Sequence, residues 1–406
     1  MKKKVLDTFA GAGGFSLGFH MTGHYDIIGA IERDKWATET FQTNHPNSKV
    51  IQSPIESLND DEIKEFFKDN KPDVILGGPP CQGFSIANKK AGDPKDPRNS
   101  LFKQFIRFGD IFSPEIMIME NVPNLMKSRT KDKKLVIDII ISELEAIGYN
   151  VSYKLLTATD YGVPQIRQRL FVIATKESIG DPFPNATHKL SSQPETLFQN
   201  NLKICPTLWE AISDLPEIEA REGSHEMEYS KPAENDYQKS MRKGSKKVFN
   251  HTAMRHSKRL VERFASMNWG DSTSDVPEHL KPLKRNGNGE ISKKVYDQNN
   301  RRMHPQKPCH TIAASFYANF VHPFKHRNFT PREGARIQSF PDWFEFKGKP
   351  TVVSHKLLQR EGRIAEKHLC QYNQIGNAVP PLLAKAIGNH IYKEINKKEC
   401  TFTETT

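Results

Sequence analysis

The sequence predicts an α/β fold built on an open, largely parallel sheet, followed by a smaller and less regular second domain. Up to about residue 175, short apolar segments alternate with helical segments, which is the pattern of βαβ units. The chain has 406 residues, of which 36% are apolar, so it can bury a sizeable core and form more than one domain. After Thr175 the composition changes to proline, serine and charged residues, which indicates a second domain.

Each expected strand is a short apolar run, and each expected helix is a longer segment with apolar residues three or four positions apart. Strands are expected at residues 4–7, 26–31, 73–76, 116–120 and 170–174. Helices are expected at residues 15–21, 35–44, 60–68, 101–108 and 134–147. A further apolar helical pattern at 382–395 needs a sheet to cover it, and the N-terminal sheet is the nearest candidate. We therefore expect a discontinuous first domain (1–180 and 368–406), with a second domain and hinge at 181–367.

The charge of the chain favours a polyanionic partner. The formal net charge is +11, and residues 239–263 carry nine Lys or Arg against one acid. Such a segment can follow the phosphates of a nucleic acid, and Arg255, Lys258 and Arg259 are our candidates for these contacts. A solvated basic helix face is the alternative interpretation.

The cysteines and the hydropathy pattern predict where the protein acts. Five cysteines lack the close CxxC or Cys/His spacing of zinc sites and disulfide frameworks, so we expect no metal and a reducing compartment. The basic start of the chain is cut off by Asp7 and a glycine loop, unlike a signal peptide. No apolar run is long enough to span a bilayer, so no membrane partner is expected. These features predict a cytoplasmic protein, or a nuclear one in a host with a nucleus.

A glycine-rich loop follows the first expected strand. Residues 7–14 read DTFAGAGG, and glycines there let the backbone approach a ligand closely. Glu32 ends the second strand about twenty residues later, where an acid can bind both ribose hydroxyls. Because the loop is not GxGxxG, it favours a mononucleoside-like cofactor over a dinucleotide. An ordinary tight turn is the alternative.

A cysteine follows the third expected strand. Residues 77–85 read GGPPCQGFS, which places Cys81 at the carboxyl edge of the sheet, where open α/β folds bind their ligands. The prolines Pro79 and Pro80 restrict the backbone before the thiol. A buried core cysteine is the alternative, but a loop this rich in glycine and proline favours a nucleophile.

Two further motifs carry charged groups toward the same edge. Glu120 ends an apolar strand in the sequence ENV, where a carboxyl group can hold or donate a proton. In the sequence QIRQR, at 165–169, strand alternation puts Arg167 and Arg169 on one face. Alone, Glu120 could be a helix cap or surface acid, and the two arginines could lie on a surface strand edge.

Taken in chain order, these segments resemble the DNA cytosine-5 methyltransferase family of bacterial restriction-modification systems. The matching segments are FAGAG at 9–13, PC at 80–81, ENV at 120–122, QIRQR at 165–169, REGAR through FPD at 332–342, and QIGNAVP at 374–380. The resemblance covers most of the chain outside about 176–300 and 346–370. It implies a Rossmann-like class I methyltransferase fold, in which helices cover both faces of a mixed sheet, with an irregular target-recognition domain.

The resemblance also implies a reaction. A methyl group passes from S-adenosylmethionine to carbon 5 of a cytosine that is flipped out of a specific double-stranded DNA site, leaving S-adenosylhomocysteine. Cys81 adds to carbon 6, while Glu120 engages ring nitrogen 3 and the exocyclic amine. Arg167 and Arg169 orient the base, and their positive charge helps to keep the thiol ionised.

The remaining sites follow from the same resemblance. Gln82 and Ser85, beside the nucleophile, are expected to brace the gap that the flipped base leaves, while the second domain reads bases in the major groove. The residues expected to bind the cofactor are Phe9, Gly11, Gly13, Glu32, Pro79, Leu101 and Asn377.

The expected partners are double-stranded DNA and a cognate restriction endonuclease acting on the same site. We expect a monomer in the bacterial cytoplasm, associated with the nucleoid through its DNA. A tRNA cytosine-5 methyltransferase is the second hypothesis, although the long basic segment before residue 300 favours DNA. A non-catalytic DNA-binding module and an NAD-dependent dehydrogenase are weaker alternatives, because neither explains Cys81 together with Glu120.

Overall fold

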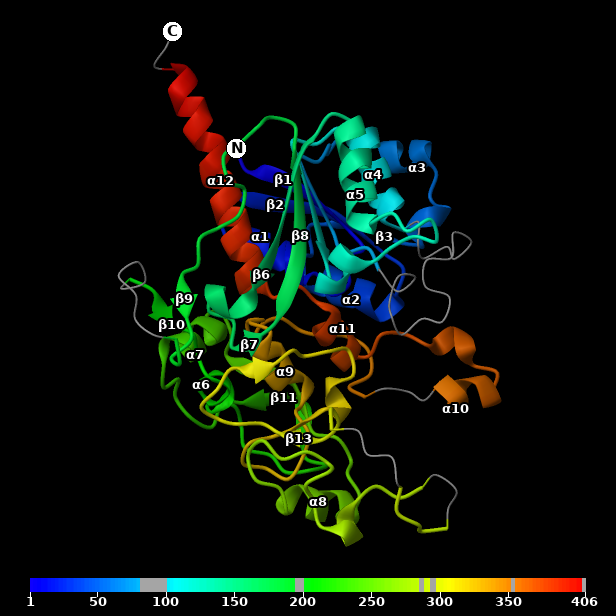
Figure 1. Ribbon diagram of the computed structural model, residues 1–406, viewed down its shortest axis with the longest axis vertical. Helices are drawn as coiled ribbons and strands as arrows, with labels where there is room; N and C mark the ends of the chain where they lie inside the picture. The colour runs from blue at the N-terminus through cyan, green and yellow to red at the C-terminus, as the bar shows by residue number, and fades with distance from the viewer. Residues whose placement is uncertain (81–100, 194–200, 285–287, 293–296, 352–354, 404–406) are drawn as a thin grey trace. The chain divides into compact units, whose positions relative to one another are not determined.

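The structure is a computed structural model that describes residues 1–80, 101–193, 201–284, 288–292, 297–351 and 355–403 (Figure 1). The chain forms two compact units. Unit 1 consists of Met1–Gly162, Arg167–Lys203 and Val379–Thr406, and unit 2 of Val163–Ile166 and Ile204–Ala378. The first unit is therefore discontinuous in sequence.

A seven-stranded sheet forms the centre of unit 1. Its order is β3-β2-β1-β4-β5-β8-β6, with β8 antiparallel to both of its neighbours and the other adjacent pairs parallel. The predicted mixed α/β fold is thus confirmed. The strands are β1 (Lys3–Thr8), β2 (Tyr25–Glu32), β3 (Lys49–Gln52), β4 (Val74–Gly77), β5 (Ile116–Asn121), β6 (Asn150–Thr157) and β8 (Gln168–Thr175).

The sequence did not predict β3 and β6, which are the two edge strands of this sheet. An edge strand has a neighbouring strand on one side only, and helices cover its two faces less completely than those of an inner strand. Fewer of its residues are therefore apolar, and the pattern in the sequence is weak. The residues of β6 are mostly exposed or half-buried, and none of the four residues of β3 is buried.

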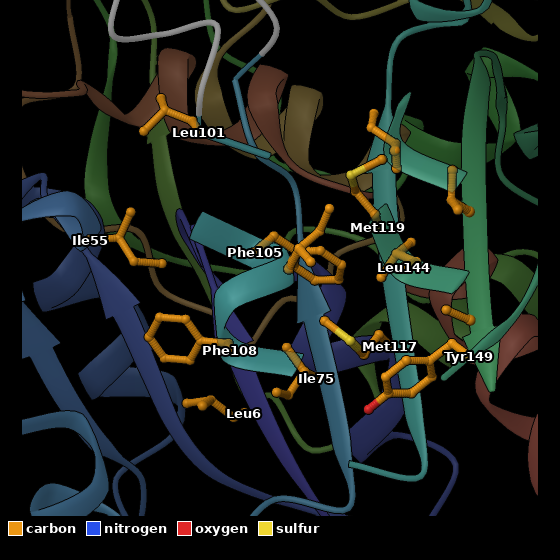
Figure 2. Close-up of a cluster of buried hydrophobic side chains, with 14 of the residues drawn as sticks. Leu6, Ile55, Ile75, Leu101, Phe105, Phe108, Met117, Met119, Leu144 and Tyr149 are labelled. Atoms are coloured by element: carbon orange, nitrogen blue, oxygen red, sulfur yellow. The ribbon is translucent and has the colours of Figure 1, made fainter. Parts of the chain in front are cut away.

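Helices cover both faces of the sheet. On one face, α3, α4 and α5 pack on Leu6, Ile75 and Met117 in one apolar cluster, in which Phe105 and Phe108 of α4 lie against the strands (Figure 2). Neighbouring strand residues point to opposite faces, so Val5 and Phe171 face the other layer. The helices of unit 1 are α1 (Gly14–His20), α2 (Lys35–Asn44), α3 (Asp60–Phe66), α4 (Leu101–Phe112), α5 (Val136–Ala146) and α12 (Pro381–Thr403).

The other face is covered by α1 together with the C-terminal helix α12 (Figure 1). The Phe15 ring of α1 packs edge-on against Phe171 of β8, with 6.0 Å between centroids. The Tyr25 hydroxyl donates a hydrogen bond to the Gly388 carbonyl at 3.0 Å, which ties β2 to α12. In the structure, the C-terminal helix thus packs on the N-terminal part of the chain.

The boundaries of the units differ from the expected positions. We expected the first domain to end at residue 180, but the chain stays in unit 1 to Lys203. Hydrogen bonds anchor this extra segment: His390 of α12 bonds to the Asp181 carbonyl at 2.8 Å, and Tyr161 donates to the Pro184 carbonyl at 2.9 Å.

The second difference concerns α11 (Gln371–Asn377), which we expected in the first domain and which belongs to unit 2. The Tyr372 hydroxyl donates to the Phe329 carbonyl at 2.8 Å, and Gln338 donates to the Ile375 carbonyl at 2.8 Å. A Cβ on Gly376 would lie 2.3 Å from the Ala313 carbonyl oxygen, so this helix packs closely against unit 2.

Unit 2 has little regular structure, as its composition predicted. Its helices are α6 (Leu208–Ile212), α7 (Asp236–Arg242), α8 (Lys258–Ala265), α9 (Pro331–Ile337), α10 (His355–Arg360) and α11. Its strands are β7 (Gln165–Ile166), β11 (Gly223–Glu228), β12 (Lys247–Thr252), β13 (Arg301–Arg302), β14 (Cys309–His310) and β15 (Phe320–Val321), while β9 (His188–Lys189) and β10 (Lys203–Ile204) pair near the boundary.

Buried ion pairs hold the centre of unit 2. Arg336 of α9 binds Asp342 through two hydrogen bonds, of 2.5 and 2.6 Å, and Asp214 at 2.9 Å. Arg327 binds Glu333 in the same bidentate manner, at 2.7 and 2.8 Å. Removing one partner would leave a buried charge uncompensated, which is strongly destabilising. The REGAR and FPD segments thus have a structural role in unit 2.

In the described part of the chain, no helix combines the length and the apolar character needed to cross a membrane.

We expect the contact between α1 and α12 to be sensitive to a single methyl group. A Cβ on Gly18 would lie 2.3 Å from Ala384 Cβ and 2.5 Å from the Pro381 carbonyl oxygen. Gly18→Ala should therefore lower the free energy of unfolding by about 1–3 kcal/mol, because overpacking outweighs the higher helix propensity of alanine. Urea unfolding followed by circular dichroism measures the change.

Gly180→Ala is the matched control, because its Cβ would meet the Glu394 side chain of α12 at an ordinary 3.5 Å. Equal stability of the two variants would contradict the proposed close packing.

Candidate active site

The strand directions bring the candidate site to one edge of the sheet. Strands β1, β2, β4 and β5 are parallel to one another, so their carboxyl ends lie at the same edge of the sheet. Because β8 is antiparallel to β5, its first residues lie beside the last residues of β5. Four of the motifs from the sequence therefore meet at this edge of unit 1.

The glycine loop leaves β1 through three left-handed backbone conformations. Phe9, Gly11 and Gly13 have φ values of 59°, 54° and 89°. A Cβ on Gly13 would lie 2.8 Å from the Phe41 ring, so this position has no room for a side chain. By contrast, nothing lies within 4 Å of a Cβ placed on Gly11, so the loop has an open side at that residue.

Glu32 fixes the shape of this loop from the end of β2. One of its carboxylate oxygens accepts a hydrogen bond from the Gly11 amide at 2.8 Å, and the other accepts one from the Asp34 amide at 2.8 Å. The side chain is buried, and burial raises its pKa, while the amide hydrogen bonds act in the opposite direction. A carboxylate has about four acceptor positions in all, so Glu32 can still accept from a ligand.

A second buried acid, Asp7, lies below the loop at the end of β1, and the sequence analysis assigned it no role. The Ser16 hydroxyl of α1 donates a hydrogen bond to its carboxyl group at 2.6 Å. Burial raises the pKa of Asp7 to about 7, the hydrogen bonds from Ser16 oppose this, and the nearby Glu32 charge adds to it. An acid that ends a strand directly before a glycine loop was the signal available in the sequence.

The segment that leads to the cysteine lies beside Glu120. Gly77 of β4 pairs with Met119 of β5, and the Asn121 side chain donates to the Pro79 carbonyl at 3.0 Å. A Cβ on Gly78 would lie 3.5 Å from Glu120 Oε2. Asn121 therefore holds β4 and β5 together at this edge. Cys81, Gln82 and Ser85 lie outside the described residues.

An ion pair joins the ENV and QIRQR motifs. Arg169 Nε lies 2.9 Å from Glu120 Oε1, and the side chains are only 13% and 12% exposed. Arg167 is buried, and its pKa is lowered by burial and then by the positive charge of Arg169, while Glu120 raises it. Residues 165, 167 and 169 are buried or half-buried while 166 and 168 are exposed, as strand alternation requires.

Two of the expected cofactor residues lie in different units. Leu101 begins α4 in unit 1 and is only 8% exposed, within the apolar cluster (Figure 2). Asn377 is exposed at the end of α11 in unit 2. Its contact with a cofactor therefore stays a prediction.

The basic segment at 239–263 is only partly engaged within unit 2, because Lys243 and Lys246 are exposed and have no ion pair among the described residues. Arg255 and Lys258 are exposed, whereas Arg259 donates a hydrogen bond to the Lys281 carbonyl at 2.8 Å. Arg263 is buried and donates to the Leu280 carbonyl at 2.6 Å. Three more basic side chains of this segment pair with acids: Lys239 with Asp236, Arg242 with Asp214, and Lys247 with Glu226.

Among the described residues, no group of three or more His, Cys, Asp or Glu side chains is arranged to hold a metal ion.

The geometry of this edge suits a reaction that needs a ligand cradle and a fixed carboxylate. The open loop at Gly11 lies next to the Glu32 carboxylate, which suits a ligand with hydroxyl groups. Glu120 Oε1 is held by Arg169, while Oε2 faces the strand end that leads to Cys81. A carboxylate and a positive charge are thus positioned at the ends of adjacent strands.

Comparisons with known proteins identify the family of the chain. Residues 3–393 match the model of a family described as C-5 cytosine-specific DNA methylase. The type II methyltransferase M.DdeI of Desulfomicrobium norvegicum is 48% identical over 387 residues, which cover 95% of this chain and 88% of that protein. The type II methyltransferase M1.HphI of Haemophilus parahaemolyticus is 32% identical, covering 97% of this chain and 87% of that protein.

Solved structures give the same result for the fold. A prophage-encoded E. coli protein, provisionally described as a DNA modification methyltransferase, superposes with a TM-score of 0.71 at 27% identity, covering 97% of this chain and 100% of that chain. The S. pombe Dnmt2 methyltransferase superposes with a TM-score of 0.58 at 17% identity, covering 97% and 100%, and supports the fold alone.

The raised pKa of Asp7 predicts how stability depends on pH. Between about pH 4, the usual pKa of an aspartate, and about pH 7, the folded chain keeps a proton that the unfolded chain releases. The free energy of unfolding should therefore fall as the pH rises through this window. Asp7→Asn removes this titration, so its stability relative to wild type should rise by roughly 1–3 kcal/mol from pH 5 to pH 8.

Urea unfolding at several pH values measures this difference. Asp26→Asn is the control, because Asp26 is exposed and paired only with Lys2 at the surface. If wild type and Asp7→Asn had parallel pH profiles, Asp7 would not keep its proton in the folded state.

Proposed function

The chain belongs to the C-5 cytosine-specific DNA methylase family, and from this premise we propose that it methylates cytosine through a covalent intermediate on Cys81. The family match and the 48% identity to a type II methyltransferase support DNA (cytosine-5)-methyltransferase activity. The observation that carries the proposal is the Glu120–Arg169 ion pair beside the strand end that leads to Cys81.

The proposed methyl donor is S-adenosylmethionine, whose sulfonium supplies an electrophilic methyl group when it is bound. The residues of the loop fit such a nucleoside: the open side at Gly11 admits the ligand, and the Glu32 lone pairs can accept hydrogen bonds from ribose hydroxyls. Phe9 and Gly13 continue this wall. Pro79, Leu101 and Asn377 remain proposed contacts.

Cys81 is the proposed nucleophile. Carbon 5 of cytosine is too weakly nucleophilic until its ring is activated, so the thiolate first adds to carbon 6 and pushes the electron pair toward carbon 5. Carbon 5 then takes the methyl group, its proton leaves to a base, and the carbon–sulfur bond breaks to release the thiolate. Cys81 follows Pro80 directly, so Asn121, which binds the Pro79 carbonyl, positions this segment.

Glu120 and the arginines stabilise this addition. Glu120 engages ring nitrogen 3 and the exocyclic amine. It supplies or stabilises the proton that ring nitrogen 3 takes up, and this proton neutralises the negative charge that the ring gains as the thiolate adds. Arg169 holds one carboxylate oxygen, so the other is oriented toward the base. The positive charges of Arg167 and Arg169 favour the thiolate over the thiol and help to orient the cytosine.

Unit 2 is the proposed target-recognition domain, and unit 1 the catalytic domain. The target base must leave the duplex before Cys81 can reach it, and Gln82 and Ser85 are proposed to brace the gap. Arg255 and Lys258, both exposed, are proposed phosphate contacts. Arg259 is a weaker candidate, because its guanidinium already binds a backbone carbonyl.

The names of the relatives support a modification enzyme of a type II restriction-modification system. A cognate endonuclease acting on the same DNA site is therefore a proposed partner, and the enzyme is proposed to act as a monomer. Its DNA substrate places it, on this proposal, with the nucleoid in the bacterial cytoplasm. The description of the matching family favours DNA over tRNA as the substrate.

The central test replaces the nucleophile. Cys81→Ser should abolish transfer of a labelled methyl group to DNA while DNA binding stays near wild type, because a hydroxyl is too weak a nucleophile for the addition. Cys370→Ser is the control, since Cys370 Sγ lies 3.2 Å from Asn373 Oδ1 and a hydroxyl can make the same contact.

Turnover by Cys81→Ser would remove Cys81 from the mechanism. DNA containing 5-fluorocytosine adds a direct readout, because the fluorine cannot leave as a proton does. Wild type should form a covalent protein–DNA species on a denaturing gel, and Cys81→Ser should not.

A second variant tests the carboxylate. Glu120→Gln keeps the shape of the side chain, but an amide cannot exchange a proton with ring nitrogen 3, so methyl transfer should fall by about 10²- to 10⁴-fold. Glu115→Gln is the control, because Glu115 precedes the same strand at its other end and pairs with Lys3 at 2.6 Å. The rate of methyl transfer in a single turnover is measured for both variants. If Glu120→Gln were as fast as Glu115→Gln, Glu120 would have no chemical role.

A further inference from the structure

A second basic segment lies next to the catalytic edge in unit 1. Residues 127–134, KSRTKDKK, carry five Lys or Arg and one acid, Asp132. We name this segment the basic turn. It follows the short 3-10 helix η4 (Pro123–Lys127), which begins two residues after Asn121 at the end of β5.

The basic turn is held in one shape by its own backbone. The Thr130 amide donates to the Lys134 carbonyl at 3.0 Å, and the Lys133 amide donates to the Thr130 carbonyl at 3.0 Å. Lys133 has a φ of 62°, and its carbonyl accepts from the Arg129 guanidinium at 2.6 Å. Little conformational entropy is therefore lost when the turn binds a ligand.

The turn is also fixed to the body that carries Glu120. Leu125 of η4 is buried in the apolar cluster under the sheet. The Val136 amide donates to the Ser128 carbonyl at 3.0 Å, and Ser128 Oγ donates to the Asn124 carbonyl at 2.9 Å. Charge on the turn is thus held in a fixed position relative to the catalytic edge.

Several charges of the turn have no acidic partner. Lys127, Lys133 and Lys134 are exposed, and no ion pair within the described residues joins any of them to an acid. In the segment at 239–263, Lys239, Arg242 and Lys247 are paired with acids. Lys243 and Lys246 of that segment are exposed without an ion pair among the described residues, as the lysines of the turn are. Unpaired lysines attract phosphate without first breaking an internal ion pair.

We propose that the basic turn binds the phosphodiester backbone of the DNA beside the target cytosine, so that unit 1 holds its substrate independently of base reading. This inference rests on the proposed function, because it assumes that the cytosine enters at the edge that carries Glu120. Phosphate contacts position a duplex without specifying its sequence. The turn therefore acts on affinity and register, and not on the choice of site.

The test is a triple variant, Lys127→Gln with Lys133→Asn and Lys134→Gln. Asparagine is used at position 133 because it tolerates a positive φ better than most residues. The probe is unmethylated bacterial genomic DNA, with labelled methyl transfer measured over a range of salt concentrations. KM for DNA should rise and kcat should stay near wild type. The slope of log(kcat/KM) against log salt should become shallower by about 0.9 for each phosphate that the variant no longer neutralises, about 1–3 in total.

The control variant replaces three other exposed lysines of unit 1, Lys64, Lys71 and Lys393, by glutamine. It removes the same amount of charge, so an equal change of slope would show a general charge effect and overturn the proposal. An unchanged KM and slope in the triple variant would also overturn it.

A single variant and the wild-type enzyme are measured in the same assay. If the triple variant fails to fold, Lys127→Gln alone carries the test, with an expected change of slope of about 0.9. Wild-type turnover is measured alongside, and its absence would refute the proposed function. Normal wild-type turnover with no effect of the triple variant would refute only the basic turn.

Discussion

The direction of one strand determines how the candidate active site is assembled. Parallel strands present their carboxyl ends at one edge of a sheet, and this brings the glycine loop, Glu32 and Glu120 together. The arginines lie at the start of β8, and they share that edge only because β8 is antiparallel to β5. A parallel β8 would place Arg169 at the opposite edge, too far to pair with Glu120.

Three acids at this edge have different surroundings. Asp7 and Glu32 are buried and bind hydroxyl or amide donors, so burial raises their pKa. Glu120 is instead held by the charge of Arg169. Buried carboxyl groups with hydrogen-bond donors shape the loop, whereas a carboxylate with a cationic partner is oriented for contact with a substrate. These surroundings agree with the proposed roles, in which Glu32 belongs to the ligand loop and Glu120 contacts the cytosine.

Much of this arrangement follows from sequence because strand ends and glycine loops leave local signals. The alternating segments predicted the five inner strands of the sheet, and QIRQR predicted the shared face of Arg167 and Arg169. The edge strand β6 could not be predicted in this way, since its residues are mostly exposed. The position of α11 in unit 2 could not be predicted from the sequence either. It depends on hydrogen bonds between residues far apart in the chain, such as that from Tyr372 to the Phe329 carbonyl.

The two basic segments show why charge in a sequence is incomplete evidence for binding DNA. The long run at 239–263 was a candidate for phosphate contacts, with a solvated basic face as the alternative. Its side chains differ in the structure: Arg263 binds a carbonyl and Lys247 binds an acid, while Lys243 is exposed. In the shorter basic turn, Lys127, Lys133 and Lys134 are exposed, and the backbone hydrogen bonds that close the turn do not use these three side chains. Attraction to phosphate depends on charges without internal partners, and only the folded structure identifies them. On our proposals, the DNA backbone is contacted by both units, by unit 1 through the basic turn and by unit 2 through Arg255 and Lys258. The contact made by the basic turn belongs to the unit that carries the chemistry, so it need not change when the recognised DNA site changes.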